Sequence, residues 1–313
     1  MVGERHAIRR GATSPSRSPA MLAASCARQA EAREPIVPAW ICATCGVQHA
    51  DSIHAPARCA ICEDERQYVG EGGQRWTTMA ELAESHAVVV KEEEPGLFGI
   101  GIEPPVAIGQ RALLVRTASG NVLWDCIPLL DDAARARLGE LGGISAICIS
   151  HPHFYGSFVE LADAFDARVL ISKADAAWIR RPSPRVELFD EEAEPVPGIT
   201  VARIGGHFDG AAVLHWPAGS EGRGALLTGD TVQVVPDRGW ASFMWSYPNL
   251  IPLDERTVEE IARRIGRFRF DRVYGGWWGR VILDDGAAAV RRSADRYVER
   301  LRGRRGSSLP GDE

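Results

Sequence analysis

The sequence contains no apolar run long enough to cross a bilayer, which excludes a membrane-spanning helix. The nearest candidate is AMLAASCA, residues 20–27, which suggests an export signal ending at Cys26 but is too short for one. We therefore expect a cytoplasmic protein. Residues 1–37 are rich in Arg, Ser, Ala and Pro without periodicity, so we expect a disordered leader there, and residues 305–313 read as a flexible tail.

The chain also lacks an excess of positive charge. Its formal net charge is -6, and only Lys91 and Lys173 are lysines among 36 basic residues. This balance gives no reason to expect a nucleic-acid partner or an anionic membrane. No glycine-rich loop stands between a strand and a helix, so no nucleotide site is indicated either. The remaining class is a globular protein of 313 residues, enough for one large domain and an accessory unit.

Four of the seven cysteines form two C-x-x-C pairs, CATC and CAIC, with thirteen residues between them. Thiolates at this spacing converge tetrahedrally on one soft ion, and disulfides are disfavoured because the chain has no convincing export signal. We predict a structural Zn²⁺, with rubredoxin-like iron as the alternative. The predicted ligands are Cys42, Cys45, Cys59 and Cys62. Cys126 and Cys148 lie at the ends of apolar strands and are expected in the core.

The segment that carries these cysteines, residues 38–75, is too short to bury a core of its own. It needs the metal to fold, so we expect a zinc-ribbon-like module there. Its acidic ending, CEDER, and its few basic residues argue against reading nucleic acid. We interpret the module as a structural knob or as a docking element for a protein partner.

From residue 76 the pattern changes to short apolar strands punctuated by helices. HAVVVKEE and GLFGIGIE read as a strand pair, and GITVARIGG, AAVLHWP and GALLTGD read as three further strands. PLLDDAARARLGEL has helical spacing, and another helix is expected near 284–303. Strand clusters alternating with helices over residues 76–304 predict an α/β domain with two layers of sheet and helices outside.

Several polar residues stop apolar strands of this domain. They are His151 and His153 in HPHFYG, His207 in GGHFDG, Asp230 in LLTGD and Asp125 in NVLWDC. Any one of them alone is well explained as a loop residue bonded to the backbone. Together they predict a metal centre, because strand ends are where open α/β folds place their ligands, and both imidazoles of H-x-H can reach one ion.

In the order Asp125, HPHFYG, GGHFDG and TGD, the chain resembles the metallo-β-lactamase fold superfamily of metallohydrolases through most of residues 80–300. The resemblance implies a four-layer αββα sandwich, preceded here by the zinc-ribbon-like module. It also implies that three histidines bind the first metal, that the aspartate of the G-D turn bridges two metals, and that an earlier aspartate supports the site. These roles fall on His151, His153, His207, Asp230 and Asp125.

The departures from the family pattern are equally specific. The family's H-x-H-x-D-H places Asp and His where this chain has Tyr155 and Gly156. The last family histidine should fall near VYGGWWG, where Trp277 and Trp278 stand instead. The second metal position has therefore lost three ligands and retains at most Asp230. The sequence predicts one ion in the sandwich rather than the two of a bridged dinuclear site.

One ion suffices for hydrolysis. Three neutral imidazoles with Asp230 or water as fourth ligand suit Zn²⁺, which lowers the pKa of bound water toward about 7. We expect metal-bound hydroxide to attack an ester, thioester, amide or lactone bond of a small-molecule substrate, with Asp230 as general base. Tyr155 is a candidate proton donor or oxyanion stabiliser, or else a packing residue that fills the lost second position. Trp277 and Trp278 are candidates for the substrate pocket.

Two alternatives to hydrolysis stay open. Two histidines with Asp230 also describe a mononuclear Fe²⁺ centre, as in the dioxygenases of this superfamily, although those relatives keep the full H-x-H-x-D-H. The other alternative is a non-catalytic metal-binding scaffold, or pseudoenzyme, whose zinc module recruits a partner. Lost ligands favour the scaffold, whereas four retained residues around the first metal position count against it.

Overall fold

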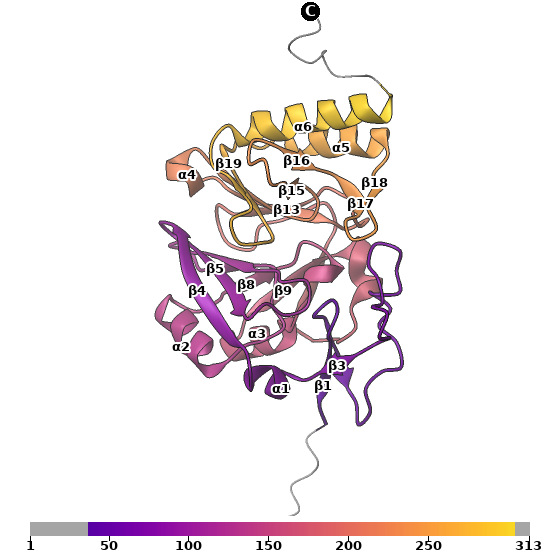
Figure 1. The fold of residues 1–313 in the computed structure, drawn as a ribbon. Helices are drawn as coiled ribbons and strands as arrows, with labels where there is room; N and C mark the ends of the chain where they lie inside the picture. Colours follow the sequence, from indigo (N-terminus) through magenta and orange to yellow (C-terminus); the bar gives the residue numbers. More distant parts are fainter. Residues whose placement is uncertain (1–36, 304–313) are drawn as a thin grey trace, which may run out of the picture. The chain divides into compact units, whose positions relative to one another are not determined.

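A computed structural model describes residues 37–303 (Figure 1). The predicted leader up to residue 36, with Cys26, and the predicted tail, residues 305–313, lie outside the described residues. Within residues 37–303, no helix combines the length and apolar character that crossing a membrane requires.

The first half of the sandwich is a seven-stranded sheet in the order β10-β9-β8-β7-β6-β5-β4. Its strands pair antiparallel from β4 to β7 and parallel from β7 to β10. The predicted strand pair is confirmed as β4 and β5, with Ala87 opposite Glu103. The strands are β4 (Ala87–Glu94), β5 (Leu97–Glu103), β6 (Ala112–Val115), β7 (Val122–Trp124), β8 (Ala146–Cys148), β9 (Arg168–Ser172) and β10 (Val186–Phe189).

Helices flank this first sheet. The predicted helix after β7 is confirmed but begins later, because Asp131 caps it with its carboxylate on the backbone N–H of Ala134. The other Asp131 oxygen accepts from the N–H of Val88 in β4 at 2.8 Å, which ties the helix start to the sheet edge. The helical segments are α1 (Met79–Ala83), α2 (Asp132–Glu140), α3 (Phe158–Phe165) and the 3₁₀ turns η2 (Pro152–Phe154) and η3 (Lys173–Trp178).

The second sheet has the order β11-β12-β13-β14-β19-β20. The three strands predicted in quick succession form its middle as β12, β13 and β14, joined antiparallel, and β19 adds to β14 in parallel. Its strands are β11 (Glu192–Ala193), β12 (Thr200–Arg203), β13 (Ala212–Trp216), β14 (Ala225–Gly229), β19 (Arg272–Gly275) and β20 (Val281–Ile282).

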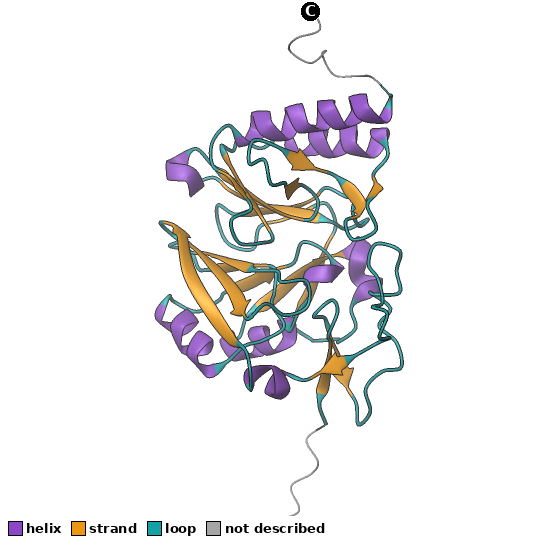
Figure 2. Cartoon of the chain, viewed as in Figure 1, coloured by secondary structure: helices purple, strands orange, loops and turns teal. Residues whose placement is uncertain are grey.

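Two long helices cover the outer face of this second sheet (Figure 2). Val258, Ile261 and Ile265 lie on one face of the first of them and are buried, as its spacing dictates. These helices are α5 (Glu255–Ile265) and α6 (Gly286–Leu301), and a short α4 (Gly219–Gly222) follows β13. Two ribbons pair β15 (Gln233–Val234) with β16 (Ala241–Ser242) and β17 (Met244–Ser246) with β18 (Ile251–Pro252).

Three apolar clusters show how the layers pack. One joins the first sheet to its helices, and another joins the second sheet to α5 and α6. The third lies between the sheets and contains Leu113 and Trp124 from the first sheet with Leu214 and Tyr274 from the second. Two sheets face to face with helices on both outer faces form the predicted αββα sandwich, which is therefore confirmed.

The cysteine-bearing segment folds as a small three-stranded sheet in the order β2-β1-β3. Its strands are β1 (Ala39–Cys42), β2 (Gln48–Asp51) and β3 (Trp76–Thr77). β3 lies beyond residue 75, so this sheet extends past the predicted end of the module. Ile41, Val47 and Ile61 share an apolar cluster with the first sheet of the sandwich. The module therefore packs on the domain instead of standing apart from it.

Candidate metal centres

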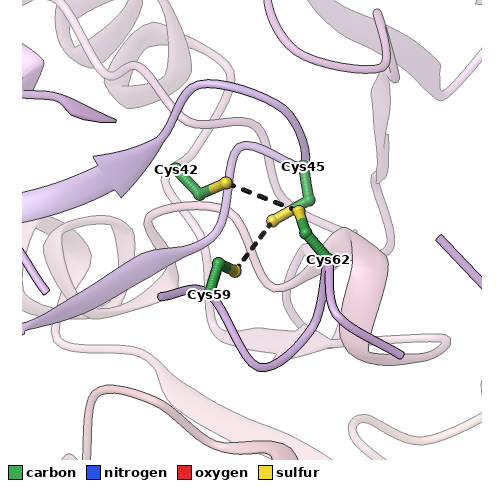
Figure 3. Close-up of side chains that lie close together, drawn as sticks. All are labelled: Cys42, Cys45, Cys59 and Cys62. Atoms are coloured by element: carbon green, nitrogen blue, oxygen red, sulfur yellow. Dashed lines mark hydrogen bonds between the residues drawn. The ribbon is translucent and has the colours of Figure 1, made fainter. Parts of the chain in front are cut away.

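The four predicted cysteines converge on one point (Figure 3). The sulfurs of Cys42 and Cys62 are 3.5 Å apart, those of Cys45 and Cys59 are 3.8 Å apart, and all four lie within 4.8 Å of one another. The first pair sits on the turn after β1, where the N–H of Gly46, in the left-handed region, donates to the carbonyl of Cys42 at 2.8 Å. The second pair sits on its own tight turn, so each pair presents two sulfurs from one side.

The chemistry of this sulfur cluster fits a soft divalent ion. Burial raises the pKa of the Cys45 thiol, whereas hydrogen bonds from Cys45 and Cys62 lower the pKa of Cys42 to about 6. Buried thiols this close cannot all ionise without a compensating cation. The side-chain amide of Gln74 donates to the Cys42 sulfur at 3.2 Å, a contact that favours the thiolate. A metal ion would satisfy all four sulfurs together.

The second centre lies where loops leave both sheets. His151 follows β8, and His153 sits on η2 directly after it. His207 lies in the loop between β12 and β13, and Asp230 follows β14. One ligand atom of each of these four residues lies within 4.8 Å of the others. The structure thus brings together the four residues predicted to hold the sandwich metal.

The four side chains of this second centre contact one another, and two of the histidines are also bonded to residues outside it. Asp230 Oδ2 is 3.4 Å from His151 Nε2 and 3.8 Å from His207 Nε2, and His207 Nε2 is 3.3 Å from His153 Nδ1. The other ring nitrogens bond outward, His207 Nδ1 to the carbonyl of Met244 at 3.1 Å and His151 Nδ1 to Ser150 Oγ at 2.8 Å. Such outward bonds fix the orientation of metal-binding imidazoles.

Several buried polar atoms of this centre have no hydrogen-bond partner among the described residues. They are His151 Nε2, His153 Nε2 and Asp230 Oδ1. Buried polar atoms normally have a partner, so a cluster of unpartnered ring nitrogens and a carboxylate oxygen calls for one that protein atoms do not supply. Imidazoles and a carboxylate are a donor set for zinc or iron. The residues present therefore fit a metal ion.

Burial sets the protonation of the ligands. Desolvation lowers the pKa of His151 to about 3 and that of His207 to about 4, so both rings are neutral at pH 7. Neutral imidazole is the form that binds a metal. Burial raises the pKa of Asp230 to about 6, and a nearby divalent cation favours its ionised form.

Two further residues shape the loops that carry the ligands. Asp125, predicted to support the site, accepts the N–H of Ser150 on Oδ1 at 2.8 Å, next to His151. Burial raises the pKa of the Asp125 carboxyl to about 8. Gly229 precedes Asp230 with a positive φ of 53°, and a Cβ there would lie 2.5 Å from Ser150 Oγ. Glycine therefore lets the end of β14 approach the histidine loop.

Tyr155 and Gly156, which stand where the family has ligands of a second metal, are both engaged in the packing of the first sheet. Tyr155 is buried in the core of the first sheet, and its hydroxyl donates to the carbonyl of Asp175 at 3.1 Å. Gly156 has a φ of 49°, and a Cβ there would lie 2.7 Å from the carbonyl oxygen of Ile127. A side chain at 156 thus has no room. These contacts are those of a packing residue, and the catalytic role of Tyr155 stays a prediction.

The two tryptophans take different positions. Trp278 lies against β5, where a Cβ on Gly99 or Gly101 would meet its indole at 2.5 Å, so it fills a contact between the two sheets. Trp277 donates its Nε1–H to the carbonyl of Ile108 at 2.8 Å. A surface cavity of about 380 Å³ is lined by Gly109, Gln233, Trp277, Trp278 and Arg280. None of the four candidate metal ligands lines it.

This tryptophan-lined cavity is separated from the metal ligands by one aromatic ring. The ring of Phe154 lies 4.8 Å from the ring of His151 and 5.6 Å from that of Trp277, measured between centroids. Phe154 is completely buried. The predicted role of Trp277 and Trp278 in a substrate pocket therefore stays a prediction.

Sequence reasoning missed two residues beside the centre. The ring of Phe208 packs against the rings of His151, His153 and His207, with centroids 5.0–5.6 Å away. Arg66, four residues after Cys62 in the cysteine-bearing segment, lies over Phe208 and donates to the carbonyl of His207. Phe208 follows a predicted ligand, which is a usable signal. Arg66 stands 141 positions away from His207 in an acidic stretch, and no local pattern indicates its role.

Comparison with known proteins agrees with this geometry. The family model described as the metallo-beta-lactamase superfamily matches residues 107–277. The chain is 47% identical over 268 residues to Uncharacterized protein YmaE of Bacillus subtilis (strain 168), covering 85% of this chain and 97% of that one.

Among solved structures, the fold is similar to that of VMB-1, with a TM-score of 0.52 and 14% identity, covering 68% of this chain and 98% of that one. It is also similar to that of the DIM-1 metallo-beta-lactamase, with a TM-score of 0.50 and 14% identity, covering 67% of this chain and 96% of that one. At 14% identity, the two structures show a shared fold and nothing more. The family model, which matches more than half of the chain, shows that the chain belongs to the metallo-beta-lactamase superfamily.

Proposed function

We propose that this protein is a hydrolase that uses a single metal ion, held by His151, His153 and His207, to cleave an ester, thioester, amide or lactone bond. The observation that carries the proposal is the convergence of three neutral imidazoles and one carboxylate within 4.8 Å, with three of their polar atoms unpartnered. Zn²⁺ is the ion we assign to this centre and to the four cysteines, because tetrahedral nitrogen and sulfur sets suit it. A small molecule is the proposed substrate.

One ion is proposed because neither residue that stands in place of the family's second-metal ligands offers a ligand. Tyr155 is committed to the carbonyl of Asp175, and the backbone of Ile127 excludes any side chain at Gly156. An ion at the remaining position supplies Lewis acidity, which lowers the pKa of water and polarises a substrate carbonyl. No bridging group between two ions is needed for that chemistry.

Residues of the chain itself would accept a proton, orient the imidazole rings and exclude water. Asp230 keeps Oδ1 free of hydrogen bonds while Oδ2 faces two histidines, so Oδ1 is placed to accept the proton of an attacking water. Met244 and Ser150 hold the outer ring nitrogens of His207 and His151 and so keep both rings oriented. Phe208 keeps water away from one side of all three rings.

The test is a screen of chromogenic esters, thioesters, lactones and amides with Zn²⁺-loaded protein. His207→Ala should abolish turnover, and Asp230→Asn should lower kcat by about 100-fold or more, as expected when a general base is lost. His215→Ala is the matched control, because that histidine lies on β13 and bonds to the carbonyl of Arg269, outside the centre. Turnover that survives in His207→Ala would overturn the proposal.

A second candidate, the metal-binding scaffold, has one observation in its favour. The side chains of the three histidines and Asp230 belong to residues that are at most 4% exposed, so a substrate reaches them only if a covering side chain moves. Metal binding without turnover of any bond class would support the scaffold. Bound iron with consumption of dioxygen would instead support the oxygenase alternative.

A further inference from the structure

The segment that follows the second cysteine pair, residues 64–67, runs along β17 of the sandwich. The hydroxyl of Ser246 donates to the carbonyl of Arg66 at 3.2 Å. The side-chain amide of Asn249 donates to the two carbonyls on either side of Arg66, each at 3.0 Å. Trp245 adds a bond from its Nε1–H to Glu65 Oε1 at 3.1 Å. The backbone on both sides of Arg66 is thus fixed to the domain that holds the histidine centre.

These bonds place the side chain of Arg66 in an aromatic cage. The residue is only 7% exposed, and its guanidinium carbon lies 3.8 Å from the ring centroid of Phe208, 4.5 Å from that of Trp245 and 5.3 Å from that of Trp178. These distances are those of cation–π stacking. Arg66 Nη1 also donates to the carbonyl of His207 at 3.4 Å. One side chain therefore reaches a metal ligand's backbone and the ring beside it.

The contact continues from Arg66 to the predicted ligands through two routes. Phe208, under the guanidinium, packs on all three histidine rings. Ser246, which binds the Arg66 carbonyl, lies in the same strand as Met244, whose carbonyl fixes Nδ1 of His207. A shift of Arg66 would therefore change both the packing and the orientation of His207.

The positive charge of Arg66, which lies beside the histidine centre, is neutralised by Asp64. Asp64 accepts from Arg66 Nε at 2.6 Å and from Nη2 at 2.9 Å, a bidentate pair. A neutral pair can sit beside a dication where a bare guanidinium would repel it. Asp64 is two residues after Cys62, so the position of the pair depends directly on the turn that the cysteine cluster closes.

We propose that Arg66 is a positioning residue of the histidine centre and that the metal-loaded cysteine cluster holds it there, so that the two centres are coupled. The inference rests on the proposed ion of the histidine centre. Its consequence is that loss of the ion from the cysteines weakens ion binding between His151, His153 and His207, although the cysteines donate no ligand to that ion.

Co²⁺ loading of the full-length protein tests this coupling without any substrate. Thiolate-bound Co²⁺ shows charge-transfer bands that histidine-bound Co²⁺ lacks, so the two sites can be titrated separately against a competing chelator. The variants are Arg66→Ala, Arg66→Lys and Cys59→Ser/Cys62→Ser. Arg58→Ala is the matched control, because this arginine lies in the same module but pairs with Glu63 on the surface, with its side chain 76% exposed.

Arg66→Ala should raise the dissociation constant of Co²⁺ at the histidine centre by about 10-fold to 100-fold, as for other outer groups that orient metal ligands, and shift its d–d bands. Arg58→Ala should change neither. Arg66→Lys should recover part of the affinity, since it restores the charge but not the planar stack. The cysteine variant should weaken the histidine centre at least as much, and adding Arg66→Ala to it should have little further effect.

Equal affinities in Arg66→Ala and Arg58→Ala would overturn the role of Arg66, and an unchanged histidine centre in the cysteine variant would overturn the coupling. If Arg66→Ala fails to fold, Asp64→Asn replaces it, because it only breaks the ion pair, and an unchanged affinity there overturns the inference. A wild-type protein that binds Co²⁺ at the cysteines alone would instead refute the proposed function.

Discussion

Substituting Gly156 by alanine tests whether the second metal position is closed by the backbone. Gly156 has a φ of 49°, and placing a side chain in the left-handed region costs about 1–2 kcal/mol. The added Cβ would lie 2.7 Å from the carbonyl oxygen of Ile127, and overpacking of this kind adds about 1–3 kcal/mol. We therefore expect Gly156→Ala to lower the free energy of unfolding by about 2–5 kcal/mol.

Gly198→Ala is the matched control for Gly156→Ala. Gly198 also has a positive φ, 87°, but nothing lies within 4 Å of a Cβ there, so it should lose only about 1–2 kcal/mol. Urea unfolding followed by tryptophan fluorescence, with the same excess of Zn²⁺ for every variant, measures both. If the two variants lose equal stability, the steric argument is wrong and a histidine at 156 would have room to restore a second ion.

Three further predictions concern other parts of the chain. Cys42→Ser/Cys45→Ser, dialysed against excess Zn²⁺, should bind one ion fewer than the wild type by elemental analysis, and an unchanged count would contradict the cysteine site. Trp278→Ala should lower the free energy of unfolding by at least about 2 kcal/mol but by less than the about 3–5 kcal/mol expected for a fully buried ring. The ion count should stay unchanged, and loss of an ion would refute the assignment of Trp278 to the contact between the sheets. Burial raises the pKa of Asp175 to about 7, whereas the pKa of an aspartate in the unfolded chain is about 3.9. Between these pH values the folded state binds one proton more than the unfolded state, so the stability of the wild type falls as pH rises from about 4 to 7. Asp175→Asn should therefore gain stability relative to the wild type across that range, by up to about 1.4 kcal/mol per pH unit in urea unfolding, and a difference independent of pH would contradict this.

The fold and the convergence of both groups of candidate ligands could be predicted because their signals are local. Two C-x-x-C turns need no knowledge of the rest of the chain, since each turn sets the direction of its own sulfurs. The candidate ligands of the sandwich each follow an apolar strand, His151 in the first sheet and His207 and Asp230 in the second, and strand ends are where α/β folds place ligands. His151, His207 and Asp230 were therefore predictable as a group, although none was convincing alone.

The surroundings of the histidine centre depend on contacts between distant segments. Tyr155 occupies a position where the family has a ligand, and only the carbonyl of Asp175 reveals that its hydroxyl is engaged in the core. Arg66 has no signal in its own stretch, because its burial results from how the zinc module packs on β17. Trp278 is different, since Gly99 and Gly101 alternate along one strand and leave a flat face for a large ring. That glycine pattern could have been read from the sequence.

The role of the cysteine-bearing segment was the least predictable part. A short cysteine-bearing segment suggests an independent unit, and a protein partner for it stays a prediction. Its apolar residues instead share a cluster with the first sheet, and Gln48 of β2 donates to Glu160 of α3 at 2.8 Å. Such contacts follow from the complementarity of two surfaces, which residue spacing does not encode.

We propose above all that the sandwich holds a single metal ion. Elemental analysis of wild-type protein and of His151→Ala/His153→Ala, both dialysed against excess Zn²⁺, tests it most directly. Two ions per wild-type chain and one per variant chain are expected, the remaining ion belonging to the cysteines. Three ions in the wild type would contradict the single-ion centre, and an equal count in both proteins would show that these histidines hold no metal.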